Sequence, residues 1–174
     1  MKVLLFNGAG GSATSTAGTL TAFLSEKIAS LGGEAVVYSI DDNDVPLFSP
    51  SKQPSAACYE MVDIFTQADA HIWLTPLYHG GMTGAMKNCL DWLELSAKNE
   101  KPYLTDKKVG LVCWAAGAQA MQGINNMDAV AKALRGWTLP YSLPVMHSSL
   151  FTQERKVSEE YENKFDLLLS MLLK

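Results

Sequence analysis

The sequence lacks the features that mark several large classes of protein. Its 174 residues include only three cysteines, Cys58, Cys89 and Cys113, an odd number at spacings that fit neither a disulfide framework nor a zinc site. No apolar run approaches the ~18 residues that span a membrane, and the short run at the N-terminus does not resemble a signal peptide. We therefore expect a cytoplasmic protein with reduced, buried cysteines and no membrane partner.

Positive charge is also scarce. Lysine and arginine total 14 against 18 acidic residues, the formal net charge is -4, and no block of basic residues occurs. Because nucleic-acid-binding proteins carry a basic patch, we expect no nucleic-acid partner. With 48% hydrophobic residues, a chain of this length can bury a core without metals or disulfides, so we predict one domain over residues 1–174.

The segment from Ala70 to Leu93 combines a strand, a glycine-containing loop and an amphipathic helix. Its apolar run ends at Pro76, which cannot donate to a sheet ladder, and Gly80 and Gly81 then allow close approach of the backbone. From Gly84 onward, apolar residues recur with helical spacing. In open α/β sheets, the loop at the carboxyl end of such a strand is where ligands bind.

Similar units fill the rest of the chain. We predict strands over 2–6, 34–40, 70–76, 107–114 and 138–147, and helices over 20–31, 56–67, 84–93, 124–137 and 157–172. Pro140 and Pro144 indicate that the last strand lies at a sheet edge. The alternation predicts an α/β fold, a doubly wound five-stranded parallel sheet of order 2-1-3-4-5 with helices on both faces. This order brings the loops after strands 1, 3 and 4 to one crevice.

The loop after the first strand, residues 8–19, mixes glycines with hydroxyl side chains. Such a loop at a helix N-terminus can hold a phosphate without a basic side chain, because unpaired backbone N–H groups and a partial positive charge point at the ligand. The candidate phosphate ligands are Ser12, Thr14, Ser15 and Thr16.

Two other interpretations of this loop remain open. Gly8, Gly10 and Ala13 fit the form of the dinucleotide-binding pattern, but the acidic residue that should follow about 20 residues later is missing at that spacing, since Asp41 lies 28 residues beyond Ala13. A glycine turn that serves packing alone is the second alternative.

The loops at 76–83 and 115–123 contain no nucleophile paired with an evident base. They are rich in small or flat residues, so a planar heteroaromatic cofactor could lie between them and supply the chemistry itself. We accordingly predict no catalytic side chain and no metal ligand. Backbone N–H groups of the turn from Tyr78 to Gly81 could bond to ring atoms, and Tyr78 could pack against the ring edge.

Residues 75–93, TPLYHGGMTGAMKNCLDWL, resemble a segment of the NADPH-dependent FMN reductase family, which reads roughly T-P-E-Y-N-x-S-x-P-G-x-L-K-N-x-x-D-W. The residues that agree are Thr75, Pro76, Tyr78, Gly84, Lys87, Asn88, Asp91 and Trp92. The resemblance implies a flavodoxin-like fold, a homodimer or homotetramer, FMN as the cofactor, and NADPH or NADH as co-substrate. It also implies reduction of flavins, quinones, azo compounds or metal ions.

The same resemblance assigns residues to the cofactor. The flavin ring would be lined by Pro76, Leu77, Tyr78, His79 and Gly80, with Ala115, Ala116 and Gly117 opposite, and the phosphate would contact Ser12, Thr14, Ser15 and Thr16. The chain departs from the family pattern in three ways. Its phosphate loop has no arginine, Leu77 replaces the usual glutamate, and His79 replaces the usual asparagine.

The sequence thus favours an FMN-dependent oxidoreductase that passes hydride from NAD(P)H to the flavin and then electrons to a small-molecule acceptor, by a ping-pong mechanism. One alternative is a flavodoxin-like electron carrier that serves a protein partner. Another is a flavin-free binding module on the same fold, which the missing loop arginine keeps open.

Several further residues suggest chemistry but have simpler interpretations. His71 and His147 are expected to be structural side chains in strands, although His79 could donate to a flavin or substrate. Asp41, Asp42 and Asp44 resemble a metal cluster but fit a turn at a strand end better. Two further expectations concern groups of residues: a surface pair of Lys87 with Asp91, and core positions for Trp73, Trp92, Trp114 and Trp137.

Overall fold

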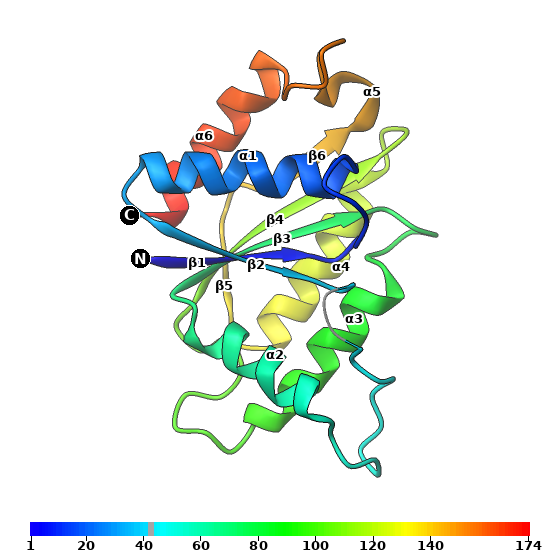
Figure 1. Ribbon diagram of the computed structural model, residues 1–174, viewed down its shortest axis with the longest axis vertical. Helices are drawn as coiled ribbons and strands as arrows, with labels where there is room; N and C mark the ends of the chain where they lie inside the picture. The colour runs from blue at the N-terminus through cyan, green and yellow to red at the C-terminus, as the bar shows by residue number, and fades with distance from the viewer. Residues whose placement is uncertain (42–43) are drawn as a thin grey trace.

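The computed structural model of the protein describes residues 1–41 and 44–174 (Figure 1). In chain order its elements are β1 (Lys2–Asn7), α1 (Thr16–Ser30), β2 (Glu34–Ser39), α2 (Ala56–Gln67), β3 (Ala70–Pro76), α3 (Gly84–Asp91), the 3-10 helix η1 (Trp92–Ser96), β4 (Lys108–Ala115), α4 (Ala120–Ala133), β5 (Trp137–Thr138), β6 (Leu143–Met146), α5 (His147–Leu150) and α6 (Glu159–Leu172). No helix in these residues is long and apolar enough to cross a bilayer.

The strands form one parallel sheet of order β2-β1-β3-β4-β5, with β6 also paired to β4. This confirms the flavodoxin-like order predicted from the sequence. Helices α1 and α6 cover one face of the sheet, and α2, α3 and α4 cover the other (Figure 1). Because β1, β3 and β4 are covered on both faces, they are buried along nearly their whole length and read as continuous apolar runs.

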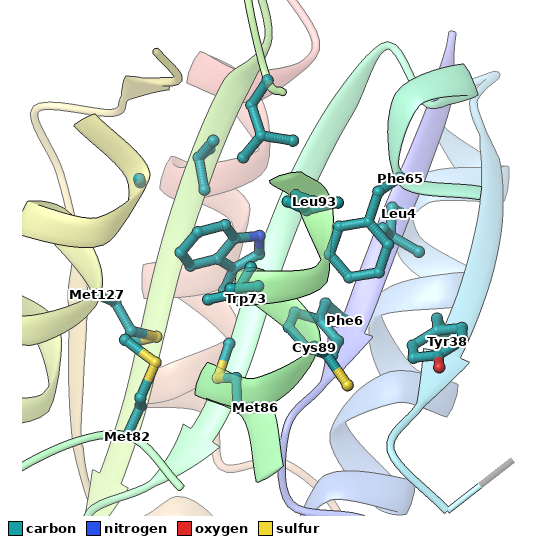
Figure 2. Close-up of a cluster of buried hydrophobic side chains, with 14 of the residues drawn as sticks. Leu4, Phe6, Tyr38, Phe65, Trp73, Met82, Met86, Cys89, Leu93 and Met127 are labelled. Atoms are coloured by element: carbon teal, nitrogen blue, oxygen red, sulfur yellow. The ribbon is translucent and has the colours of Figure 1, made fainter. Parts of the chain in front are cut away.

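A large aromatic cluster fills the space between the sheet and helices α2 and α3 (Figure 2). The Phe6 ring packs edge-on against Phe65, with ring centroids 4.8 Å apart, and against Trp73 at 6.4 Å. Cys89 lies in this cluster, and burial raises the pKa of its thiol to about 11. The cysteines at 58, 89 and 113 are all buried and free, as expected, so they act as small apolar side chains.

The C-terminal third differs from the predicted pattern. The single strand expected over 138–147 is divided into β5 and β6, because Pro140 has no N–H to continue the ladder. The edge position is confirmed, since both segments pair only with β4. Trp137 was predicted to end the helix over 124–137 and to lie in the core, but α4 ends at Ala133 and Trp137 lies in the two-residue strand β5, where it is 69% exposed. His147 was expected in a strand but begins α5 and is exposed.

The other histidine expected to be structural is buried in β3. The Nε2–H of His71 donates to the carbonyl of Phe65 at 3.0 Å. Burial, reinforced by the charge of Lys107, lowers the pKa of His71 to about 3. His71 is therefore a neutral core residue, which confirms its structural interpretation.

Candidate cofactor-binding site

A pocket of about 240 Å³ opens at the carboxyl ends of β1, β3 and β4. Its walls are formed by Ala9, Gly10, Gly11, Ser15, Thr16, Ala17, Pro76, Tyr78 and Trp114. These residues come from the β1–α1 loop, the first turn of α1, the segment after β3 and the end of β4. Three segments that are distant in the sequence therefore meet at one edge of the sheet, where ligands bind in open α/β folds.

The β1–α1 loop is shaped by the buried side chain of Asn7. Its Oδ1 accepts hydrogen bonds from the backbone N–H groups of Ala9 at 3.0 Å and Gly10 at 3.1 Å. Gly10 and Gly11 then adopt φ values of 67° and 93°, which other residues reach only with strain. The Gly11 N–H donates to the Asp41 carboxylate at 2.6 Å, so an acidic side chain rests against the loop.

The first turn of α1 presents its open end to the pocket. Ser15 caps the helix, and its hydroxyl accepts from the Gly18 N–H at 3.1 Å. The N–H groups of Thr16 and Ala17 have no acceptor within the helix, because they belong to its first turn. Both residues line the pocket, so the positive end of the helix dipole favours an anion there.

The other two predicted phosphate ligands lie on the outer side of this loop. The hydroxyls of Ser12 and Thr14 are 3.1 Å apart and hydrogen-bonded to each other, and both residues are exposed and absent from the pocket wall. The loop also contacts the distant C-terminal part of the chain: Arg155 donates to the Thr14 carbonyl, and His147 lies against the Thr16 hydroxyl. A local sequence pattern contains no signal for contacts across more than 130 residues.

The segment after β3 folds into a tight hairpin turn. The Tyr78 N–H donates to the Gly81 carbonyl at 3.0 Å, and the Gly81 N–H donates to the Tyr78 carbonyl at 3.2 Å. His79 and Gly80 both have positive φ, 50° and 88°, as a two-residue turn of this hand requires. The N–H groups left for a ligand are therefore those of the turn tip, His79 and Gly80. Asn126 of α4 holds the turn in place by accepting from the Met82 N–H at 3.2 Å.

The predicted ring-binding residues are only partly brought together. Of those after β3, Pro76 and Tyr78 line the pocket, while Leu77 is half-buried and the turn tip projects into solvent. From β4, Trp114 lines the pocket. The predicted residues Ala115, Ala116 and Gly117 follow it directly; the first is buried, the second exposed and the third half-buried. Their role in binding a ring stays a prediction.

The residues that carry the family motif have visible structural roles. Asn88 accepts from the Phe48 N–H at 2.7 Å and donates to the Pro46 carbonyl at 3.0 Å. The Trp92 indole N–H also donates to Pro46, at 2.7 Å. The expected surface pair of Lys87 with Asp91 is confirmed, with 2.5 Å between its charged atoms. Asp42, one of the acidic residues considered above, lies outside the described residues.

The fold and the pocket define a flavodoxin-like α/β protein with a pocket at the carboxyl edge of its sheet. Residues 1–149 match the family model of the NADPH-dependent FMN reductases, and the chain belongs to this family. It is 27% identical over 109 residues to the NADPH-dependent FMN reductase ArsH of Rhizobium meliloti, covering 63% of this chain and 44% of that protein. It is 30% identical over 105 residues to an NADPH azoreductase of Bacillus sp. strain OY1-2, covering 59% and 54%.

The chain spans about half the length of these curated relatives. Solved structures with the same fold include an oxidoreductase from Corynebacterium diphtheriae, with a TM-score of 0.74, 16% identity and coverage of 99% of this chain and 97% of the other. The flavoenzyme FerB of Paracoccus denitrificans, an NAD(P)H:(acceptor) oxidoreductase, gives a TM-score of 0.72 with 17% identity and coverage of 98% and 96%. At these identities the likeness concerns the fold.

Proposed function

We propose that this protein is an FMN-dependent NAD(P)H oxidoreductase that reduces a small acceptor such as a flavin, a quinone or an azo compound. The observation that carries the proposal is the pocket in which the open end of α1 faces the Pro76 and Tyr78 segment across the sheet edge. Membership of the FMN reductase family supports the choice of cofactor, and the azoreductase and FMN reductase relatives support the acceptor class.

The residues present fit the two ends of FMN. The phosphate would lie against the N–H groups of Thr16 and Ala17 and the Ser15 cap, where the helix dipole favours negative charge. The ring would lie toward Tyr78 and Trp114, which also line the pocket. Ser12 and Thr14 would support the phosphate loop from its outer side, since their hydroxyls bond to each other.

FMN, when bound, would supply the chemistry by accepting a hydride from the nicotinamide and releasing electrons to the second substrate. The protein's own contribution is position. Tyr78 is 63% exposed at the pocket mouth, and the N–H groups of His79 and Gly80 point from the turn tip, where they can orient a ring or its polar edge. If the nicotinamide and the acceptor use this same open side in turn, the kinetics are ping-pong. The dimeric or tetrameric assembly and the cytoplasmic location remain predictions.

One observation favours a second candidate, a flavin-free binding module on this fold. The Asp41 carboxylate already accepts from the Gly11 N–H, a group that a phosphate-binding loop would otherwise offer to its ligand. Residues 8–19 also contain no basic side chain to offset that negative charge. Such a module would have the same pocket but would not bind FMN.

A flavin titration separates these functions. FMN fluorescence is measured as purified protein is added, and the visible absorbance of the complex is recorded before and after anaerobic addition of NADPH or NADH. The oxidoreductase predicts quenching of FMN fluorescence, bleaching by the nicotinamide, and steady NAD(P)H oxidation with a small quinone. Protein that leaves FMN fluorescence unchanged and oxidises no NAD(P)H would overturn the proposal in favour of the flavin-free module. Bleaching without turnover on any small acceptor would indicate an electron carrier.

A further inference from the structure

A short C-terminal segment lies against the β1–α1 loop and carries two side chains that contact it. This segment, residues 147–155, comprises α5 and the turn that follows, and it lies on the α1 side of the sheet near the N-terminal end of α1 (Figure 1). His147 Nε2 is 3.0 Å from the Thr16 hydroxyl, and Arg155 Nη2 donates to the Thr14 carbonyl at 2.8 Å. The two contacts hold the loop and the first turn of α1 from outside.

The side chains of His147 and Arg155 both contact the aromatic ring of Phe151. The Phe151 ring packs edge-on against His147, with ring centroids 6.3 Å apart. The Arg155 guanidinium lies over the same ring, 5.6 Å from its centroid. Because the His147 imidazole and the Arg155 guanidinium contact the same half-buried ring, a shift of that ring would move both relative to the loop.

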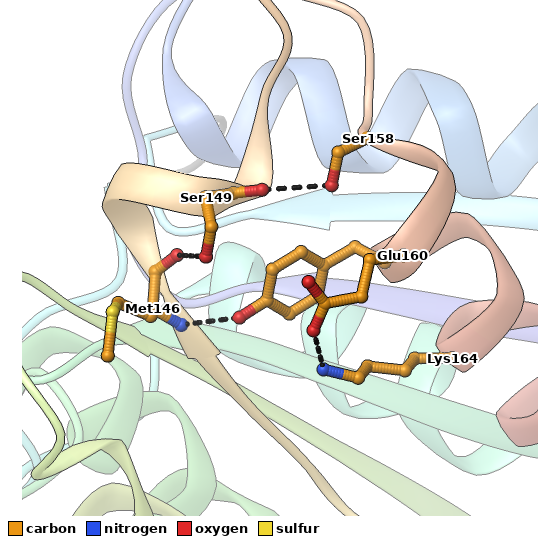
Figure 3. A network of polar contacts seen from close by, with 6 residues as sticks. Met146, Ser149, Ser158, Glu160 and Lys164 are labelled. Carbon is orange, nitrogen blue, oxygen red and sulfur yellow. Dashed lines mark hydrogen bonds and ion pairs between the residues drawn. The ribbon is translucent and has the colours of Figure 1, made fainter.

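The segment itself is fastened to the helix that follows it. Ser158 donates to the Ser149 carbonyl at 2.9 Å (Figure 3), and the Met146 N–H donates to the Tyr161 hydroxyl at 2.8 Å. The Ser158 N–H also donates to the Leu150 carbonyl at 2.8 Å. His147 and Arg155 are therefore presented by an anchored segment, so little ordering is needed when they act on the loop.

The charges around the loop leave the Arg155 cation available. Of the nearby acids, Glu154 pairs with Lys156 at 3.2 Å and Glu162 pairs with Lys27 at 2.6 Å, while Glu26 lines the same surface hollow as Arg155 without an ion pair to it. Asp41 accepts from the backbone of the loop. Within residues 1–41 and 44–174, no carboxylate forms an ion pair with Arg155. The Arg155 guanidinium thus lies, without an ion-pair partner among the described residues, beside a loop that has no basic residue of its own.

We propose that Arg155 and His147 complete the phosphate site, with Arg155 supplying from the C-terminal segment the positive charge that the β1–α1 loop lacks. The ligand class is a phosphate monoester, the flavin 5′-phosphate, and the inference rests on the proposed function. Both are positioning residues, because they contact the loop through Thr14 and Thr16. The site would therefore discriminate between flavins with and without a phosphate.

The test compares FMN with riboflavin, which has the same ring but no phosphate, by fluorescence quenching at two salt concentrations. Arg155→Gln removes the charge, Arg155→Lys keeps it, and Lys156→Gln removes an equal charge one residue further along the chain. We expect Arg155→Gln to raise the FMN Kd by a factor on the order of 10, because the positive charge beside the phosphate loop is lost, with the riboflavin Kd unchanged. The FMN Kd of Arg155→Lys should lie between those of the wild type and Arg155→Gln, and the FMN Kd of Lys156→Gln should remain within about twofold of the wild-type value.

His147→Ala should raise the FMN Kd about threefold, since it removes a single hydrogen bond to Thr16.

The outcomes distinguish the two proposals. Wild-type protein that binds neither flavin overturns the proposed function and this inference together. FMN bound equally well by the wild type and Arg155→Gln overturns this inference alone, as does an equal loss of FMN and riboflavin affinity, which would indicate damage to the fold. If Lys156→Gln raised the FMN Kd as much as Arg155→Gln does, the effect would reflect the general positive charge of the segment. That result would also overturn the assignment of Arg155 to the phosphate site.

Discussion

The Thr83 hydroxyl donates to the carbonyl of Gly8 at 2.5 Å and so joins the loop after β1 to the start of α3. The same oxygen caps α3 by accepting from the Met86 N–H at 3.1 Å. Two of the segments that form the edge of the sheet are thereby fixed to each other by one buried side chain. The position of the glycine loop thus depends on a residue 75 positions further along the chain.

Replacing this hydroxyl should therefore affect both stability and flavin binding. Thr83→Val keeps the shape but leaves the Gly8 carbonyl and the Met86 N–H without their partner, which should lower the free energy of unfolding by about 1–3 kcal/mol. Thr83→Ser keeps the hydroxyl and should lose under about 1 kcal/mol. Urea unfolding measures the stabilities, and FMN titration should show weaker binding for the valine variant only. Equal stabilities of the two variants would contradict this role.

Much of the fold could be predicted because its signals are local. Gly32 and Gly33 end α1 as expected: Gly32 has a φ of 79°, and the N–H groups of Gly32 and Gly33 donate to the Ala29 and Ile28 carbonyls. Helix α2 coincides with the predicted range 56–67. The order of the sheet followed from the alternation of apolar strands and amphipathic helices, which the chirality of parallel connections restricts to few topologies.

The errors arose where long-range contacts or edge positions decide the structure. His147 lies in an apolar stretch that reads as a strand, but β6 ends at Met146 and the chain turns into α5. Trp137 has a core-like side chain, but its strand is two residues long at the end of the sheet. The contact of Arg155 with Thr14 is likewise absent from any local pattern, because 141 positions separate the two residues.

The second prediction concerns Asn88, a residue of the family motif that contacts the loop before α2. Asn88 holds Phe48 and Pro46 through two hydrogen bonds, and its side chain is half-buried. Asn88→Ala should lower the free energy of unfolding by about 1–3 kcal/mol and raise hydrogen exchange at the Phe48 N–H. The neighbouring Lys87→Ala breaks only an exposed pair with Asp91 and should cost under about 1 kcal/mol. An unchanged exchange rate at Phe48 in Asn88→Ala would rule out this anchoring role.

The neutral core histidine gives a pH dependence. The pKa of His71 is about 3 in the folded protein, against an ordinary value of 6.5 for histidine, so between these pH values the unfolded chain binds a proton that the folded chain excludes. The contribution to the free energy of unfolding is thus constant above pH 6.5 and falls as the pH drops toward 3, by up to about 1.4 kcal/mol per pH unit.

His71→Gln should reduce this dependence, because the glutamine amide can donate to the Phe65 carbonyl but does not titrate. Urea unfolding between pH 7 and 5 should therefore show a shallower loss of stability on acidification for the variant than for the wild type. Carboxyl groups titrate mostly below this window and affect both proteins alike. A His71 ring signal that titrates near pH 6 in the folded wild-type protein would refute the explanation.

The last prediction separates backbone strain from crowding at the glycine loop. Gly10 has a φ of 67°, and a β-carbon there would collide with the Asp41 carboxylate. Gly32 has a φ of 79°, but a β-carbon there would meet nothing within 4 Å. Gly32→Ala should therefore lose only the strain of a left-handed backbone, about 1–2 kcal/mol, and should leave FMN affinity unchanged. Gly10→Ala adds displacement of Asp41 from the Gly11 N–H, so it should lose more stability in urea unfolding and should also change the FMN Kd. Equal losses in the two variants, with equal FMN affinities, would show that the Asp41 contact does not shape the pocket.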